Sequence, residues 1–167
     1  MALRYLFRSM ILLALAARGF SQATATPPPG EAPRGAGAAV LAEPEKALGL
    51  RLAEAWESFG PPEKVFALRG QEAWQDDVVF QYPAGLSLFW FQDRLWQLRF
   101  SGSYPGHVYG LLVGDPEDRL ASLLGQPLAT IGDSYVFELP YQGYPVRLRA
   151  VARGGKVVDL YLYRADF

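Results

Sequence analysis

The chain has 167 residues, with 16 basic and 17 acidic side chains, a formal net charge of −1 and no cysteine. The missing cysteine excludes disulfide bonds, thiolate catalysis, cysteine-ligated zinc and cysteine lipidation, and the charge gives no indication of a nucleic-acid partner. Half of the residues are hydrophobic and 14% are aromatic, which indicates a packed core rather than a disordered chain.

Residues 1–25 have the three-part pattern of a secretory signal peptide. Arg4 and Arg8 form a positive n-region, residues 10–17 are apolar, and small residues follow that offer cleavage sites. The apolar run is shorter than the roughly 20 residues that a membrane-spanning helix needs. We therefore expect an exported protein, periplasmic or secreted. A buried core helix and an uncleaved anchor are the alternatives, and only the anchor would hold the chain at a membrane.

Residues 26–44 follow as a stretch rich in proline, alanine and glycine, beginning with Pro27-Pro28-Pro29-Gly30. Proline and glycine at this density sustain neither a helix nor a strand, and the few apolar side chains cannot form a core. We expect a linker here, followed by two similar units over residues 45–104 and 105–167.

The two units share landmarks in the same order. Leu48-Gly49 and Val113-Gly114 open them, and Phe59-Gly60 and Leu124-Gly125 follow at one constant spacing, each with a proline soon after. Apolar residues between these landmarks recur at the spacing of a helix face. Each unit is therefore expected to begin with a short helix, which ends at a glycine followed by a proline.

Each expected helix is followed by a strand and then a β-hairpin. The strands cover residues 77–82 and 134–139, and we expect three-residue hairpin loops at 92–94 and 154–156. One face of the first hairpin then carries Leu86, Leu88, Trp90, Trp96, Leu98 and Phe100, and one face of the second carries Val146, Leu148, Ala150, Ala152, Val158, Leu160 and Leu162. We expect these faces, with Trp56, to form the core.

The expected fold class is therefore α+β, built as two tandem repeats of a short helix packed on an antiparallel β-sheet. The pattern of hydrophobic-Gly, short helix, Leu-Gly-x-Pro and terminal hairpin resembles the small envelope proteins of the SmpA/OmlA type. The doubling is similar to the tandem arrangement of β-lactamase inhibitory proteins. The resemblance covers roughly residues 48–163 and implies an α+β fold, an envelope or extracellular location and binding by the exposed sheet face.

Residues suited to catalysis or metal binding are few. His107 is the single histidine, and no Gly-x-Ser-x-Gly turn supplies a nucleophile. Asp76-Asp77 and Glu117-Asp118 lack the pattern of a calcium loop. A two-carboxylate hydrolase could draw on Asp93, Glu138 and Asp159, but the sequence does not say whether any two of them meet.

The solvent-facing sides of the hairpins are the better candidate for function. We expect a binding face made of Phe89, Phe91, Arg99, Arg147, Arg149, Tyr161 and Tyr163. Large aromatic rings beside arginines are typical of recognition surfaces. Arginine stems and tyrosine rings that merely cover a sheet face are the alternative reading.

We therefore predict a non-enzymatic binding or scaffolding module of the bacterial cell envelope, which engages an envelope protein through this face. Binding of an anionic polymer or a small ligand, through arginines and tyrosines of the second hairpin, is the alternative, and a hydrolase is a further one. No cofactor, metal site or nucleic-acid partner is expected.

Overall fold

The computed structural model describes residues 41–72 and 75–167. The expected signal peptide and most of the expected linker lie outside the described residues, whereas Leu41, near the end of that linker, is buried in the core. Among the described residues, none of the helices has the length and hydrophobicity that crossing a bilayer requires.

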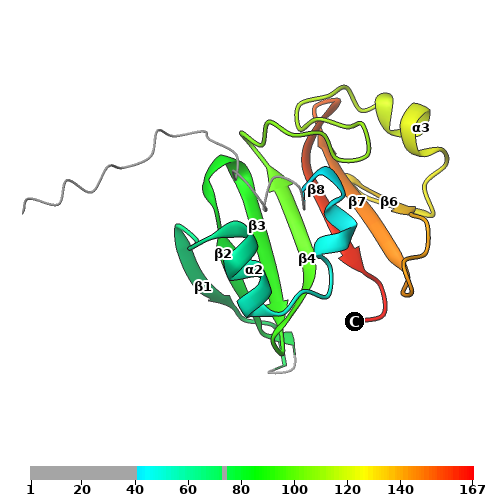
Figure 1. Cartoon of the computed structure of the whole chain (residues 1–167). Helices are drawn as coiled ribbons and strands as arrows, with labels where there is room; N and C mark the ends of the chain where they lie inside the picture. The colour runs from blue at the N-terminus through cyan, green and yellow to red at the C-terminus, as the bar shows by residue number, and fades with distance from the viewer. Residues whose placement is uncertain (1–40, 73–74) are drawn as a thin grey trace, which may run out of the picture.

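Eight strands, two α-helices and two short 3-10 helices make up the described chain (Figure 1). In chain order they are η1 (Pro44–Ala47), α2 (Leu52–Phe59), β1 (Lys64–Leu68), β2 (Asp77–Gln81), η3 (Pro83–Gly85), β3 (Leu86–Phe91), β4 (Arg94–Ser101), α3 (Arg119–Leu124), β5 (Ala129–Ile131), β6 (Ser134–Glu138), β7 (Val146–Arg153) and β8 (Lys156–Arg164).

All eight strands belong to one antiparallel sheet with the order β1-β2-β3-β4-β8-β7-β6-β5. Strands β1 to β4 form one meander and β5 to β8 a second. The central pair β4 and β8 joins the two meanders, with Leu98 opposite Leu162 and Phe100 opposite Leu160.

The expectation of two helix-on-sheet repeats is wrong, because the fold is dominated by one continuous sheet. Strand β4 pairs directly with β8, so the two halves do not have separate sheets. The helices are also too short to form a full helical layer over the sheet in each half. Helix α2 has eight residues and α3 only six.

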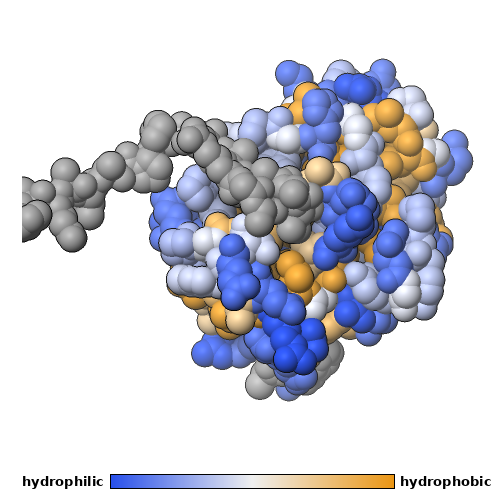
Figure 2. Space-filling model, viewed as in Figure 1, coloured by the Kyte–Doolittle hydropathy of each residue, from blue (hydrophilic) through white to orange (hydrophobic). Residues whose placement is uncertain are grey.

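A single core lies between the sheet and the segments on its inner face. The helices contribute Ala55, Phe59 and Leu120, while the connector after β4 contributes Tyr104, Val108 and Leu111. Strand residues that form the floor of the core are Phe80, Leu86, Leu88, Trp90, Leu95, Leu98, Phe100, Phe137, Val146, Leu148, Ala150, Val157, Leu160 and Leu162. Figure 2 shows that the helix side of the molecule is largely hydrophilic, with hydrophobic residues gathered in separate patches.

Both hairpins have a two-residue loop and a β-bulge, where three-residue loops were expected. In the first hairpin Phe91 pairs with Arg94 across Gln92 and Asp93, which both have positive φ angles. The register then shifts between Phe89 and Trp90, so that Trp96 is the extra residue. The second hairpin repeats this arrangement, with the register shift between Val151 and Ala152. The assignment of Val158 to the core is therefore wrong, because it is the extra residue and Val157 is buried instead. The expected pairing of Leu88 with Leu98, beyond the bulge, is confirmed.

Only one of the three tryptophans that were expected in the core is buried there. Trp90 is 3% exposed and packs in the core as expected. Trp56 is 47% exposed, so its assignment to the core is wrong. The assignment of Trp96 to the core is wrong as well. The bulge turns its indole towards Asp77, on the opposite side of the sheet.

Gly85 lies directly before β3, where the chain passes close to the end of β4. Its φ angle is +77°, a conformation that residues with a Cβ adopt only at a cost. A Cβ atom built on Gly85 would lie 1.8 Å from the carbonyl oxygen of Ser101, which no backbone can tolerate without moving. The entry into β3 therefore requires glycine both for its conformation and for its size.

We expect Gly85→Ala to lower the free energy of unfolding by more than about 3 kcal/mol, because it adds a backbone clash to the conformational cost. Gly143→Ala is the matched control, since Gly143 has a φ angle of +82° and open space around it. The control should lose only about 1–2 kcal/mol. Urea unfolding of both variants measures the difference, and equal losses would contradict this account.

Candidate functional site

The sheet face opposite the helices, called the outer face below, brings most of the expected binding residues together. Six of the seven lie on the central strands in two neighbouring rows. One row runs through Phe89, Gln97, Tyr163 and Arg147, and the other through Ser87, Arg99, Tyr161 and Arg149. The structure places the seventh residue, Phe91, beyond the bulge and away from these rows.

Tyr161 lies between two guanidinium groups in the second row. The Cζ atom of Arg149 is 4.1 Å from the centroid of the tyrosine ring, and that of Arg99 is 5.6 Å away. Arg99 also donates from Nε and Nη2 to Oδ1 of Asp159, at 2.9 and 2.7 Å. Pairing with a carboxylate neutralises Arg99, whereas Arg149 is held mainly by its contact with the ring.

Arg147 and Arg149 have no ion pair with any described carboxylate. Their Nε atoms are buried and have no acceptor among the described residues. A buried donor without an acceptor costs about 1–3 kcal/mol. These two side chains therefore carry positive charge and unsatisfied hydrogen-bonding capacity on the outer face.

An apolar groove lies on the same face over strands β1 to β3, and Arg99 lines its end. Phe66, Leu68, Val79 and Phe89 line a cavity of about 210 Å³ that reaches Arg99. Phe66 and Leu68 remain about half exposed, at 46% and 49%. The expectation that Phe89 is exposed to solvent is wrong: it is 8% exposed and forms the floor of this groove, beside Val79.

Phe91 belongs to a second site, at the end of β3. Together with Trp96 and Phe167 it lines a cavity of about 400 Å³, which Gly70, Gln75 and Asp77 complete. The ring of Phe167 meets Phe91 edge-on at 6.2 Å and faces Trp96 at 6.4 Å, measured between centroids. We call this site the aromatic pocket.

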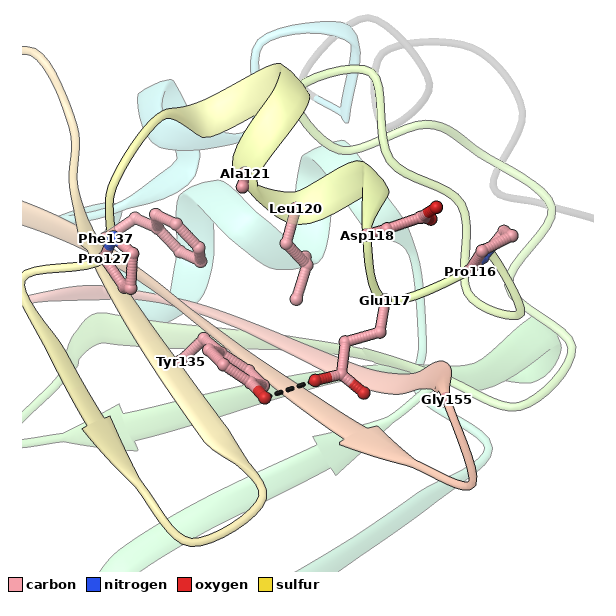
Figure 3. A pocket seen from close by; sticks show the side chains of 9 residues that line it. All are labelled: Pro116, Glu117, Asp118, Leu120, Ala121, Pro127, Tyr135, Phe137 and Gly155. Atoms are coloured by element: carbon pink, nitrogen blue, oxygen red, sulfur yellow. Dashed lines mark hydrogen bonds between the residues drawn. The ribbon is translucent and has the colours of Figure 1, made fainter.

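A third cavity, of about 530 Å³, lies between α3 and the sheet (Figure 3). Leu120, Phe137 and Pro127 supply apolar walls, and the carboxylate of Glu117 reaches the hydroxyl of Tyr135. That hydrogen bond raises the pKa of Tyr135 above its ordinary value. Most of the surface of this cavity is apolar.

The residues considered for catalysis are dispersed. His107 is exposed in the connector, Asp93 accepts a hydrogen bond from the backbone of Leu52, and Asp159 is paired with Arg99. Glu138 is exposed at the C-terminal end of β6. In the part of the chain that the structure describes, histidine and acidic side chains form no cluster able to hold a metal ion.

The groove and the aromatic pocket include residues that the sequence analysis missed. Strand β1, which supplies Phe66 and Leu68, was not expected, although its run Lys64-Val65-Phe66-Ala67-Leu68 has the composition of a strand. Asp77, Trp96 and Phe167 come from distant parts of the chain, and no local pattern links them.

No protein-family model and no curated protein matches the chain. Among solved structures, it is similar to an extracellular protein containing an SCP domain from Bacillus anthracis strain Ames, with 8% identity and a TM-score of 0.49. The match covers 73% of this chain and 45% of that one, so the chain spans less than half the length of that protein. At this TM-score the likeness bears on neither the function nor the site.

Asp77 is the titratable group of the aromatic pocket. Burial raises the pKa of its carboxyl group above the ordinary value, against the opposing effect of the hydrogen bond from Trp96. The folded protein therefore takes up this proton at a higher pH than the unfolded chain. Burying the charged carboxylate lowers the free energy of unfolding. This loss is absent below the pKa of Asp77 in the unfolded chain, about 3.9, and is complete above its pKa in the folded protein.

We expect Asp77→Asn to raise the urea midpoint at pH 7, because the amide oxygen keeps the hydrogen bond from Trp96 while the buried charge is removed. The gain should shrink as the pH falls from 7 to about 4, towards the unfolded pKa. Asp133→Asn, at an exposed aspartate, is the control for removing a charge. A gain of equal size at both pH values, or a loss at pH 7, would contradict the prediction.

Proposed function

We propose that this chain is a non-enzymatic binding module, exported to the cell envelope, that engages a protein partner through the outer face of its sheet. The observation that carries the proposal is the presence on that one face of the apolar groove over β1 to β3 and, on β7, of two arginines that pair with no carboxylate among the described residues. The helices η1, α2 and α3 pack on the other face of the sheet (Figure 1).

The chemistry of the outer face defines the partner. The groove floor of Val79 and Phe89 suits an apolar side chain, and the half-exposed Phe66 offers further apolar area at the sheet edge. Arg147 and Arg149 suit carboxylates, which can bind a guanidinium through two hydrogen bonds. We infer a protein surface on which apolar side chains stand beside acidic ones.

A protein partner fits these features better than an anionic polymer does. Arg99, the arginine that lines the groove, is already neutralised by Asp159. The net charge of −1 supplies no long-range attraction for a polyanion. An apolar groove next to the arginines would add nothing to the binding of such a polymer.

The proposal of a non-enzymatic role is supported by the separate structural engagements of the acidic side chains. Asp93 accepts a hydrogen bond from the start of α2, and Asp159 pairs with Arg99, so both carboxylates have structural partners. The proposal of export is supported by the pattern of residues 1–25.

Photo-crosslinking from two positions tests which face binds. Benzoylphenylalanine at Phe66, on the outer face, should give a discrete adduct with an envelope protein, and the same group at Leu123, on α3, should not. The two side chains are 46% and 43% exposed, so the positions are matched for access. Adducts of equal yield from both positions, or from Leu123 alone, would refute the outer face as the binding surface.

Charge reversal at Arg149 tests the electrostatic part of the interface. We expect Arg149→Glu to lower the affinity for the crosslinked partner at least about tenfold, since it places a carboxylate against the partner's acidic side chains. Lys46→Glu, at an exposed lysine on η1, should change little. Circular dichroism checks that both variants fold, and surface plasmon resonance measures the affinities.

The same measurements separate the proposal from polymer binding. Apolar contacts are insensitive to salt, whereas binding to exposed charges weakens as ionic strength rises. Capture that persists at moderate salt and is lost in Phe66→Ser supports a protein partner. Capture that salt abolishes and Phe66→Ser leaves intact would instead indicate an anionic polymer.

A further inference from the structure

The aromatic pocket is built from three rings that come from separate elements. Phe91 ends β3, Trp96 is the bulged residue of β4, and Phe167 follows β8. Phe167 meets one ring edge-on and faces the other, so the cavity of about 400 Å³ has aromatic surface on more than one side. This volume is far larger than a water molecule needs and is sufficient for a small organic ligand.

One carboxylate contributes charge to this aromatic pocket. Oδ1 of Asp77 accepts a hydrogen bond from the indole Nε1 of Trp96 at 2.9 Å. No other side-chain partner of Asp77 is found among the described residues. The neighbouring Asp76 is already paired with Arg69. Asp77 is therefore a carboxylate beside three aromatic rings, and no cation pairs with it in the described part of the chain.

Arg164, a cation close to Phe167, is balanced by another carboxylate. The guanidinium of Arg164 lies 4.8 Å from the centroid of Phe167 and 4.1 Å from that of Tyr144. It also donates to both carboxylate oxygens of Asp166, at 3.0 and 2.7 Å. Arg164 does not line the cavity, and its charge is balanced by Asp166 rather than by Asp77.

Aromatic faces attract cations through the ring quadrupole, and rings grouped around a cavity are the usual way to recognise quaternary ammonium groups. A carboxylate beside the rings adds direct charge attraction. A primary ammonium needs several hydrogen-bond acceptors, and this cavity offers few. A methylated ammonium needs none, because its methyl groups pack on the rings.

We propose that the aromatic pocket binds an alkylammonium group, with Phe91, Trp96 and Phe167 contacting the methyl groups and Asp77 balancing the charge. The site is distinct from the apolar groove and the arginines of the outer face, and it stands independently of the protein-binding function proposed there.

Choline and its neutral isostere 3,3-dimethyl-1-butanol test the proposal on the unmodified full-length protein. The two molecules have the same shape and differ in the charge of the head group. We expect saturable choline binding by calorimetry, at least about fivefold tighter than binding of the isostere, from cation–π and charge attraction. Absence of saturable choline binding, or equal affinity for the two molecules, would overturn the proposal.

Variants locate the site. Asp77→Asn should weaken choline binding and leave that of the isostere unchanged, while Asp133→Asn, at an exposed aspartate, should change neither. Phe91→Leu keeps an apolar side chain and removes a ring, so it should also weaken choline binding severalfold. Choline binding that both pocket variants retain in full would place the site elsewhere and refute the assignment.

Phosphatidylcholine vesicles show whether the alkylammonium group belongs to a lipid headgroup or to a free solute. Co-sedimentation that free choline reverses would support the aromatic pocket and assign the ligand to a lipid headgroup. Choline binding without co-sedimentation would support it as a site for a free solute. Co-sedimentation that neither choline nor Asp77→Asn affects would count against it.

Discussion

The pairing of β4 with β8 is the interaction on which the rest of the structure depends. It joins two four-stranded meanders through the register Gln97 to Ser101 against Asp159 to Tyr163. On the inner face this pairing brings Phe100 against Leu160, so one core serves both halves. On the outer face it places Arg99 beside Tyr161, which then lies between two guanidinium groups. Without this pair of strands there would be neither a continuous core nor a continuous row of arginine and tyrosine side chains.

Away from the turns, period-two alternation predicted the faces of the hairpins, because side chains of a strand point alternately to opposite sides of the sheet. The expected pairing of Leu88 with Leu98 is observed, and Arg149 and Tyr161 share a face as expected. The alternation did not predict the loops. A two-residue loop followed by one bulged residue takes up as much chain as a three-residue loop, so both descriptions give the same register far from the turn. Gly154-Gly155 carried a signal for the shorter loop, whereas Gln92-Asp93 did not.

Exposure was harder to predict than orientation. Phe89 does point to the outer face, yet it is only 8% exposed, because it packs beside Val79 at the bottom of a groove. Trp56 fits the apolar stripe of a helix, yet α2 is too short to bury the whole stripe, and the indole stays 47% exposed. Burial depends on how a sheet curves and on what covers it, and these are tertiary properties that an alternating pattern does not contain. The division of the fold into two helix-on-sheet units failed for the same reason.

The bulge in β4, which the sequence pattern did not predict, places Trp96 in the aromatic pocket. In an unbroken strand Trp96 would point to the core, two positions from Leu98, as the sequence analysis expected. The extra residue instead leaves Leu95 in the core and turns Trp96 to the outer side, within hydrogen-bonding distance of Asp77. Bulges re-aim side chains in this way near functional sites. The second hairpin has the corresponding bulge, but there the extra residue is Val158, which has no aromatic ring to contribute. The same backbone device therefore produces a pocket only where the re-aimed side chain is a large aromatic ring with a carboxylate and further rings within reach.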